Sequence, residues 1–390
     1  MENPKFFRDG KKKIQIKSLT GIKIFERQVL CKKVDGKKQR EIPINDFFQR
    51  IKRGKAFVSK NLERESIEQC LKNSYRKSEQ NIDRKLSKET IRRTVLIKGK
   101  QSEELEKTTI KEKQNTEEQL KDAETSKSNY KKSKGGIMRS ILGKIFNRNI
   151  LYLMADGVGV EQQDKTQKSI KLGKRECKVG VFLQQTDDQI KQLATFCTWQ
   201  RVDQFKDTLE WVLLGIFSFK RKIIIISDGA KWIKNLRKKI PALKNAEWIL
   251  DWFHFKDRTL KVLRRFELDE DSEVAQTILD LCWFGKSDLA LKTIQQLPLS
   301  QDEEEAEEQR QAIKKYQTYI HNQCEGIINY QAYKMKGYLV GSGCVEKIND
   351  QLVKDRMVHQ GRMRWVLEGG EAMMQLLTAK WNGRLAEVFV

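Results

Sequence analysis

Residues 150–157 have the sequence ILYLMADG, an apolar run that ends in Asp156 followed by a glycine. A second apolar run occupies residues 223–226, and after one serine it is followed by Asp228 and another glycine. Unbroken apolar runs of this length are typical of strands in a sheet that is covered on both faces. Because α/β folds place their chemistry at the carboxyl ends of such strands, the two stretches predict an α/β sheet with two acidic residues at its rim.

A third acid, Glu346, lies far downstream in the sequence VGSGCVE at residues 340–346. Taken alone, an aspartate before a glycine is more often a turn or helix-cap residue, and Glu346 is an ordinary helix-surface residue. Together, Asp156, Asp228 and Glu346 predict a cage of hard oxygen ligands that suits Mg²⁺. Two bound ions, with Mn²⁺ expected to substitute for Mg²⁺, would clamp the attacking and leaving oxygens of a phosphodiester.

The pattern from residue 148 onward predicts strands that first follow one another and then alternate with helices. This order favours a mixed sheet of the RNase H-like kind, with an all-helical insertion before the helix that carries Glu346. The expected strands are 149–155, 176–183, 195–199, 222–227 and 247–252. The expected helices are 203–217, 230–239, several between 255 and 335, and then 343–358 and 369–380.

The N-terminal part predicts a small β unit over residues 1–46, because apolar and charged residues alternate there and Asp35-Gly36 is a hairpin turn signal. Residues 99–147 are rich in Gln, Glu, Lys, Thr and Ser, and this composition predicts a basic and polar linker, with a solvated helix possible in its first part. The remaining expected domains are a helical region at 47–98, the sheet domain at 148–254, its helical insertion at 255–337, and its last acidic helix with C-terminal helices at 338–390.

Helical spacing over residues 47–98 predicts short helices around a break, with Ser87 as the N-cap of the second one. This arrangement fits a helix-turn-helix that reads the major groove of DNA, and on pattern alone it fits a plain basic helical hairpin equally well. Basic residues on the outer surface of the second helix are the candidate DNA contacts. They are Lys88, Arg92 and Arg93.

The charge of the chain is strongly asymmetric. The formal net charge is +24, of which residues 1–150 contribute +20 and the remaining residues only +4. Such an excess of positive charge in residues 1–150 is expected of a protein that binds a polyphosphate, and double-stranded DNA is the expected partner. A lysine-rich, solubilising surface is the plainer explanation, but it does not account for the difference between the halves.

The seven cysteines are widely spaced and contain no Cys-x-x-Cys pair, so the sequence predicts reduced thiols and no zinc ribbon. The longest apolar stretches, such as residues 211–217, are too short to span a bilayer. The N-terminus lacks the apolar segment of an export signal. We therefore expect a cytoplasmic, nucleoid-associated protein that has no membrane partner.

Short segments around the acids carry a resemblance to a known family. They are ADG at 155–157, KVGV at 178–181, DGAKWI at 228–233, ILDWFH at 249–254, GSGCVE at 341–346, GRMRW at 361–365 and GEAM at 370–373. In this order they resemble the bacterial insertion-sequence DDE transposases of the Kra and Lre groups, which are related to mutator-like transposases. The resemblance covers residues 148–385 and implies an enzyme that cuts and rejoins DNA at the ends of its own element.

Carried over to this chain, the resemblance implies that Asp156, Asp228 and Glu346 are the catalytic metal ligands. Asp251 and His254 match the family's Asp-x-x-His element. From the residues alone, Asp251 is either a helix cap or a residue that supports a ligand. His254 either orients an acid or contacts a phosphate, or it is a structural histidine. The basic pair Arg362 and Arg364 is a further candidate for phosphate contacts.

The resemblance also implies a homodimer or a larger synaptic assembly, because two element ends must be brought together. The N-terminus departs from the pattern, since many relatives carry cysteine pairs there and this chain has none. Two other functions stay open at this point. One is a catalytically inactive DNA-binding regulator on a transposase-derived scaffold, and the other is a structure-specific nuclease without strand transfer.

Overall fold

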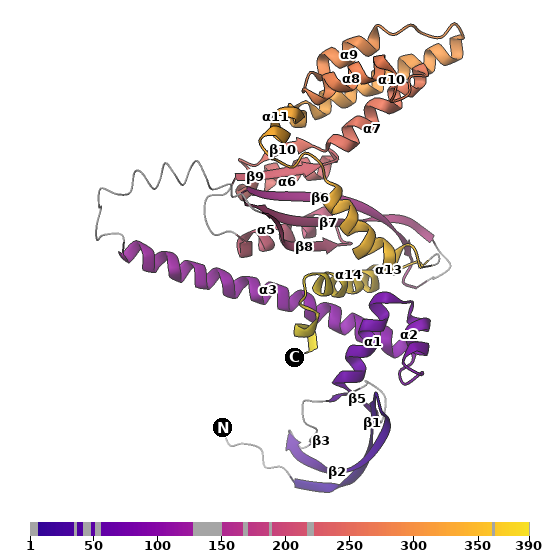
Figure 1. Cartoon of the computed structure of the whole chain (residues 1–390). Coiled ribbons are helices and arrows are strands. Elements are labelled where there is room, and N and C mark those ends of the chain that lie inside the picture. The colour runs from indigo at the N-terminus through magenta and orange to yellow at the C-terminus, as the bar shows by residue number, and fades with distance from the viewer. Residues whose placement is uncertain are drawn as a thin grey trace. The chain divides into compact units, whose positions relative to one another are not determined.

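The computed structural model of the chain is shown in Figure 1. It describes residues 7–34, 37–41, 48–50, 56–127, 150–166, 171–186, 189–216, 222–360 and 363–389. The chain divides into two compact units that are both discontinuous in sequence. The first unit comprises Met1–Glu106, Val160–Lys174 and Leu352–Val390, and the second comprises Lys107–Gly159 and Arg175–Gln351. These units cut across the linear ranges expected from the sequence, because the C-terminal residues pack with the N-terminal ones.

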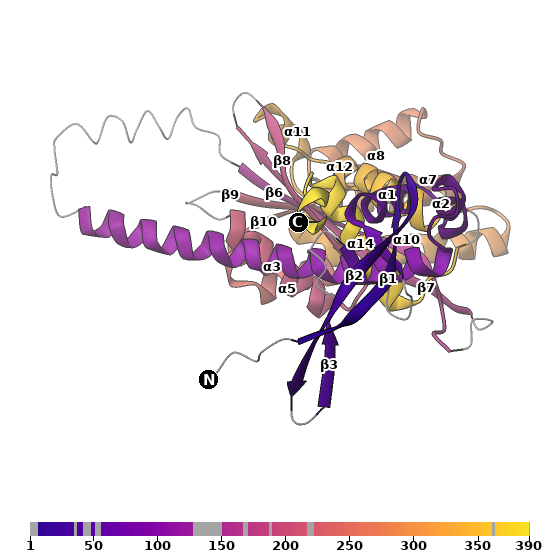
Figure 2. The same cartoon turned by 90° about the horizontal axis from the view of Figure 1, so that it is seen from below.

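A five-stranded sheet begins the first unit, and its strands β1 and β2 form a long hairpin (Figure 2). Its order is β3-β2-β1-β5-β4, in which only β1 and β5 are parallel. The strands are β1 Phe7–Ser18, β2 Gly21–Val34, β3 Lys37–Glu41, β4 Phe48–Arg50 and β5 Ala56–Ser59. Strands thus occupy the range where alternation predicted them, and β4 and β5 extend the sheet past residue 47, where helical spacing was expected. The turn signal at Asp35-Gly36 lies outside the described residues.

Three helices follow the sheet: α1 Lys60–Lys72, α2 Tyr75–Asn81 and α3 Lys88–Lys127. The predicted break lies between α2 and α3, where Asp83 and Arg84 adopt positive φ angles of 53° and 55°. Ser87 caps α3 as expected, since its Oγ accepts a hydrogen bond of 3.3 Å from the backbone N–H of Thr90. The second helix is much longer than predicted and includes most of the expected linker, because Glu, Lys and Gln are good helix formers.

The first part of α3 packs against α14, Leu367–Trp381, whose residues 370–379 are all buried. The two helices approach closely at Gly99, where an added Cβ would lie 2.5 Å from the carbonyl oxygen of Ala372. Lys98 is also buried, and its ammonium donates to the carbonyl of Val388 at 3.1 Å and pairs with Glu63 at 3.6 Å. These contacts explain why the N-terminal and C-terminal segments form one unit.

Arg356 joins two further segments of this unit. It belongs to α13, Asp355–Met357, and is 1% exposed. Its Nε donates to the carbonyl of Cys70 at 2.5 Å, and its guanidinium lies over the rings of Trp365 and Tyr75, 4.9 Å and 5.7 Å from their centroids. The planar guanidinium therefore connects α1 and α2 to the C-terminal segment.

The second unit is built on a mixed five-stranded sheet with the order β10-β9-β6-β7-β8. Strand β6 is parallel to β9, which is parallel to β10, whereas β7 and β8 are antiparallel. The strands are β6 Ile150–Gln163, β7 Lys171–Gln185, β8 Ile190–Thr198, β9 Lys222–Ser227 and β10 Glu247–Leu250. The mixed α/β architecture is confirmed. The apolar runs of β6 and β9 are buried along their length, as expected for strands covered on both faces.

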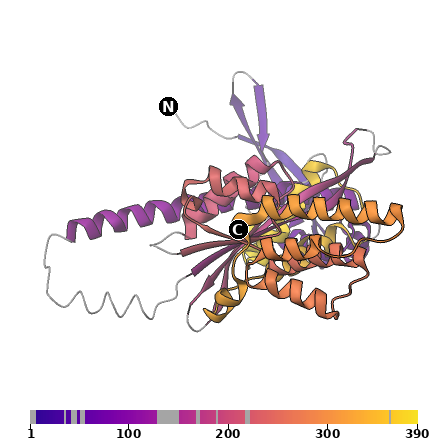
Figure 3. The ribbon, with the colours of Figure 1, turned by 90° about the horizontal axis from the view of Figure 1, so that it is seen from above.

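Helices α5 Val202–Ile216 and α6 Lys231–Lys239 connect the later strands, and a helical block follows β10. The block comprises α7 Trp252–Leu263, α8 Glu273–Trp283, α9 Ser287–Gln295, α10 Glu303–Gln323 and α11 Tyr330–Met335 (Figure 3). An aromatic cluster joins three helices of the block, because Trp252 of α7, Trp283 of α8 and Tyr330 of α11 pack with ring centroids 4.7–5.7 Å apart. The Tyr330 hydroxyl also donates to the carbonyl of Leu250 at 2.9 Å.

The segment that carries Glu346 is interrupted, although the sequence predicted one helix over 343–358. Helix α12, Gly343–Ile348, passes into a π-helical turn, Asn349–Lys354, before α13. Such π turns inside helices are frequent at functional sites. In the part of the chain that the structure describes, no helix combines the length and the apolar character needed to cross a membrane.

Candidate active site

Three aspartates lie where the pairing of the three parallel strands ends. Asp228 and Asp251 directly follow β9 and β10, whereas Asp156 lies within β6, because this strand continues to Gln163 and does not end at residue 155 as expected. Strand β6 pairs with β9 in a register that sets Met154 opposite Ile226, so the same register continued by two residues sets Asp156 opposite Asp228. Strand β10 pairs with β9 with Leu250 opposite Ser227, so Asp251 follows directly opposite Asp228. Because neighbouring strands lie about 4.8 Å apart, this register brings three carboxylates to one short stretch of the sheet edge.

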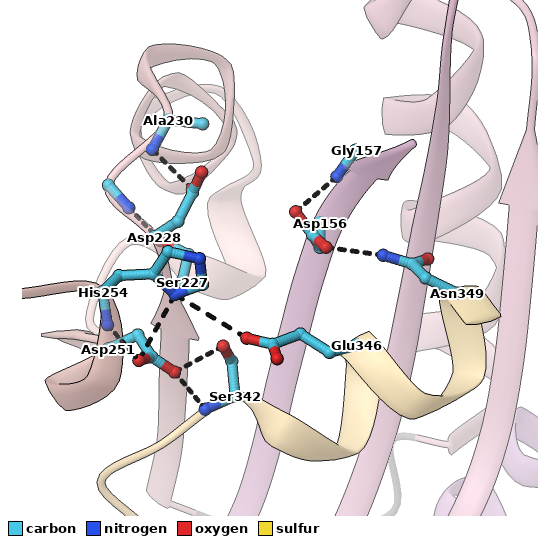
Figure 4. Close-up of polar contacts among 11 residues, drawn as sticks. Asp156, Gly157, Ser227, Asp228, Ala230, Asp251, His254, Ser342, Glu346 and Asn349 are labelled. Carbon is cyan, nitrogen blue, oxygen red and sulfur yellow. Dashed lines mark hydrogen bonds and ion pairs between the residues drawn. The ribbon is translucent and has the colours of Figure 1, made fainter. Parts of the chain in front are cut away.

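Asp156 is held by two donors. Its Oδ1 accepts from the backbone N–H of Gly157 at 2.7 Å, and its Oδ2 accepts from Nδ2 of Asn349 at 2.5 Å (Figure 4). Burial raises the pKa of Asp156 above its ordinary value, and the negative charges of Asp228 and Glu346 act in the same direction. A nearby cation would therefore bind this carboxylate favourably.

Asp228 lies at the start of the turn that leads into α6. Its Oδ1 accepts from the backbone N–H of Ala230 at 2.8 Å. The glycine that follows it is required by the backbone, because Gly229 has a φ of +87° and an added Cβ would lie 2.6 Å from the side chain of Gln323. The left-handed backbone of Gly229 thus directs the chain from the end of β9 toward α6, which explains why a glycine follows Asp228.

Asp251 is fully buried and has its carboxylate saturated by donors. Its Oδ1 accepts from the backbone N–H of His254 at 2.9 Å and caps α7, while its Oδ2 accepts from both the backbone N–H and the hydroxyl of Ser342. Burial alone would raise the pKa of Asp251, but the hydrogen bonds from His254 and Ser342 lower it below its ordinary value. Asp251 therefore joins the start of α7 to the loop that precedes α12.

The loop before α12 fits closely against α7. An added Cβ at Gly341 would lie 2.9 Å from the ring of Phe253, and the carbonyl of Val340 accepts from the backbone N–H of Trp252 at 3.1 Å. Together with the bonds between Asp251 and Ser342, these contacts fix where α12 begins. The position of Glu346, one turn into α12, follows from them.

His254 and Glu346 face each other. Nδ1 of His254 lies 3.4 Å from Oδ1 of Asp251 and 3.7 Å from Oε1 of Glu346 (Figure 4). The contact with Asp251 outweighs the effect of burial and, with the charges of Glu346 and Asp228, raises the pKa of His254 to about 9. The imidazole is thus a cation near neutral pH, and it offsets part of the negative charge of the cluster. Candidate ligand atoms of Asp251, His254 and Glu346 all lie within 4.8 Å of one another.

Asn349 is a site residue that the sequence analysis missed. It is fully buried, and while its amide nitrogen bonds to Asp156, its Oδ1 has no hydrogen-bond partner among the described residues. A buried amide oxygen without a partner is costly, and it is an oxygen donor of the type that Mg²⁺ accepts. The signal in the sequence is the spacing Glu346-x-x-Asn349, which places both side chains on one side of a helical turn.

The residues at this edge fit a divalent cation. Carboxylates of Asp156, Asp228 and Glu346, with the amide oxygen of Asn349, form a set of hard oxygen donors. In the described part of the chain, the three carboxylates alone do not bring their oxygens within 4.8 Å of one another, because Glu346 is directed toward His254. The negative charges of Asp228 and Glu346 nevertheless act on Asp156, and a cation would offset that repulsion.

The candidate DNA contacts of the first unit are exposed, and two of them are already paired. Arg92 and Arg93 both contact Glu89, at 2.9 Å and 3.2 Å. Lys88 and Arg364 are exposed on the surface of the same unit. Arg362 lies outside the described residues.

The chain was compared with protein families, curated proteins and solved structures. Residues 138–388 match the sequence profile of a family described as "Uncharacterised protein family (UPF0236)". No curated protein matches the chain. Among solved structures, the chain is similar to one in the "Drosophila P element transposase strand transfer complex", with 12% identity over 60% of this chain and 78% of that chain and a TM-score of 0.28. At that score the likeness supports no conclusion about mechanism.

Proposed function

This chain belongs to the uncharacterised protein family UPF0236, and we propose that it is a DDE transposase that cuts and rejoins DNA at the ends of an insertion sequence. The observation that carries the proposal is the common register of Asp156 and Asp228, just beyond the last residue pair between the parallel strands β6 and β9, with Glu346 directed toward His254 of the same cluster. The segments shared with the Kra and Lre groups support the insertion-sequence class.

The strand order supports an RNase H-like sheet. In chain order the strands of the second unit lie as third, second, first, fourth and fifth, with the antiparallel pair on one side and the parallel strands on the other. The helical block then separates the strand-end aspartates from Glu346, as expected of an insertion in this fold. For the first unit, α2, the break and α3 support a helix-turn-helix, with Lys88, Arg92 and Arg93 as its proposed DNA contacts.

In the proposed chemistry, Asp156, Asp228 and Glu346 would hold two Mg²⁺ ions, or Mn²⁺ in their place. Such ions would supply Lewis-acid activation of an attacking water or 3′-hydroxyl and would stabilise the leaving oxygen of the phosphodiester. The chain supplies the positions: Asn349 orients the carboxylate of Asp156, and Asp251 fixes the loop from which Glu346 projects. His254 holds a proton beside Glu346 and is placed to contact a phosphate oxygen or to release Glu346 when a cation binds.

A cleavage assay tests this function. A supercoiled plasmid that carries the DNA flanking the gene should be nicked in Mg²⁺ or Mn²⁺ by the wild-type chain. Asp228→Asn should bind the same DNA and lose nicking, because it removes a metal ligand and leaves the surface charges that contact DNA. Asp207→Asn, an exposed aspartate on α5, is the matched control and should cut normally. Equal cutting by Asp228→Asn would show that the site assignment is wrong.

The same assay separates the alternatives. Binding without nicking by the wild-type chain would favour a catalytically inactive DNA-binding regulator, and nicking without joining of the cut ends would favour a structure-specific nuclease. Binding should weaken steeply with salt, since each phosphate contact contributes about −0.9 to the slope of log affinity against log salt concentration. Because two ends must be joined, we expect a homodimer or larger assembly on DNA, which light scattering of the complex measures.

A further inference from the structure

The helical block carries a basic groove that the chemistry proposed above does not use. The groove lies between α7 and α10 and has a volume of about 320 Å³. Four cationic side chains line it, and one carboxylate, Glu308, lies among them. The cations are Arg258, Lys261, Arg265 and Lys315.

The basic side chains of α7 continue the line of the site residue His254. Arg258 lies one turn after His254, and Lys261 follows at the spacing that keeps side chains on one face of the helix. Arg265 lies in the 3-10 turn Arg264–Phe266 that directly follows α7. At about 1.5 Å per residue, the helix carries this face about 10 Å from His254 to Lys261. This length matches the rise of about three base pairs of DNA. The first cation of the groove, Arg258, thus lies one helical turn from His254, and Lys261 lies farther from the acid cluster.

The charge of the groove is available for a ligand. Lys261 and Arg265 each have one carboxylate partner, Asp257 at 2.5 Å and Glu308 at 2.6 Å. Within the described residues, neither Arg258 nor Lys315 has a carboxylate within 4.0 Å, and both side chains are exposed. The guanidinium of Arg258 lies 5.9 Å from the ring centroid of Tyr319, which holds it at the groove.

We propose that this groove binds the phosphate backbone of the DNA strand that leads into the acid cluster. The inference rests on the proposed function and names a part of the substrate that it contacts. Arg258 and Lys261 follow one another along α7, Arg265 lies just past its end and Lys315 lies on α10, and cations spread in this way suit successive phosphates better than a single small anion. Arginine also matches the geometry of phosphate oxygens with paired N–H donors.

The test compares two neighbouring lysines of α10. Lys315→Glu reverses a charge in the groove, whereas Lys314→Glu makes the same change on an exposed side chain that does not line it. Affinity for a fluorescent duplex that carries the DNA flanking the gene is measured by anisotropy over a range of salt concentrations. We expect Lys315→Glu and Arg258→Gln to weaken binding and to reduce the salt slope by about 0.9 for each phosphate that the variant no longer neutralises. Lys314→Glu should bind almost as well as the wild type.

The outcomes separate this proposal from the proposed function. Equal loss of affinity for Lys314→Glu and Lys315→Glu would show an effect of net charge alone and would overturn the proposal that the groove binds DNA. Wild-type affinity and salt slope in the Lys315→Glu and Arg258→Gln variants would overturn it as well. In either case, metal-dependent nicking by the wild type that Asp228→Asn loses would leave the proposed function standing. A wild-type chain that binds no duplex would overturn both. Circular dichroism of each variant verifies that the fold is intact.

Discussion

Asn349 donates a hydrogen bond of 2.5 Å to the carboxylate of Asp156, although 193 positions of sequence separate the two residues. This bond connects the first strand of the sheet to the turn that directly follows the helix of Glu346. It therefore fixes the distance between two acids that no local pattern relates. It also leaves the Oδ1 atom of Asn349 buried and facing no described donor, which makes this residue part of the candidate cation site.

Replacing Asn349 tests that relationship. We expect Asn349→Ala to lower the free energy of unfolding by about 1–3 kcal/mol, because a buried hydrogen bond to a charged acceptor is removed. It should also reduce metal-dependent nicking, since Asp156 loses the donor that orients it. Urea unfolding and the plasmid assay measure the two effects. Gln351→Ala changes an exposed residue of the same π-helical turn and is the control; if both variants behave alike, the orienting role of Asn349 is wrong.

The saturated carboxylate of Asp251 predicts a pH-dependent effect. Asp251→Asn should destabilise the chain near neutral pH, because the new amide group directs hydrogens at the donors of Ser342. The pKa of Asp251 is lowered in the folded state, so its contribution is fully present above the unfolded value of about 3.9 and is lost as the pH falls through the folded value.

Unfolding curves from neutral pH down to about pH 3 check this prediction, since that range spans the ordinary aspartate pKa. The difference between wild type and Asp251→Asn should be largest near neutral pH and should shrink in acid. Asp280→Asn, an exposed aspartate on α8, should show no such trend. A deficit that stays constant with pH would mean that the charge of Asp251 is not what stabilises the loop before α12.

Metal ions should stabilise the fold. Because Asp156, Asp228 and Glu346 repel one another, Mg²⁺ or Mn²⁺ is expected to raise the melting temperature, with a gain of about 2.7 kcal/mol at a concentration one hundred times the dissociation constant. Asp228→Asn should melt at least as high as the wild type without metal and should lose most of the metal-dependent rise. Differential scanning fluorimetry measures both. An identical rise in the variant would place the cation elsewhere.

We expect the planar shape of the Arg356 side chain, and not only its charge, to stabilise the first unit. Arg356→Lys should lower the free energy of unfolding by about 1–3 kcal/mol, because an ammonium cannot stack on Trp365 and Tyr75 as a planar guanidinium does or make the same directed bond to the carbonyl of Cys70. Hydrogen exchange should show weaker protection in α1, α2 and α14. Arg384→Lys, whose guanidinium pairs with Glu387 in the same unit, is the control. Equal protection in the two variants would contradict the role of Arg356.

The sequence by itself determined the local elements. The apolar runs predicted where β6 and β9 begin, Ser87 predicted the beginning of α3, and Asp156 and Asp228 could each be found from the end of an apolar run. These features are local, because burial of a short run and capping of a helix depend on neighbouring residues alone. The packing of the first part of α3 against α14 could not be predicted from the sequence, since the close approach of Gly99 to Ala372 joins residues far apart in the chain.

Only the tertiary structure decided which residues meet. The hydrogen-bond ladders set the register that aligns Asp156, Asp228 and Asp251, and no residue of either strand encodes that offset separately. Three further features depend on packing between distant segments. They are the contact of Asn349 with Asp156, the hydrogen bonds between Asp251 and Ser342, and the joining of N-terminal and C-terminal segments into one unit. Sequence supplies the acids and the strand ends, and the pairing of strands and the fit of α12 bring their charges together.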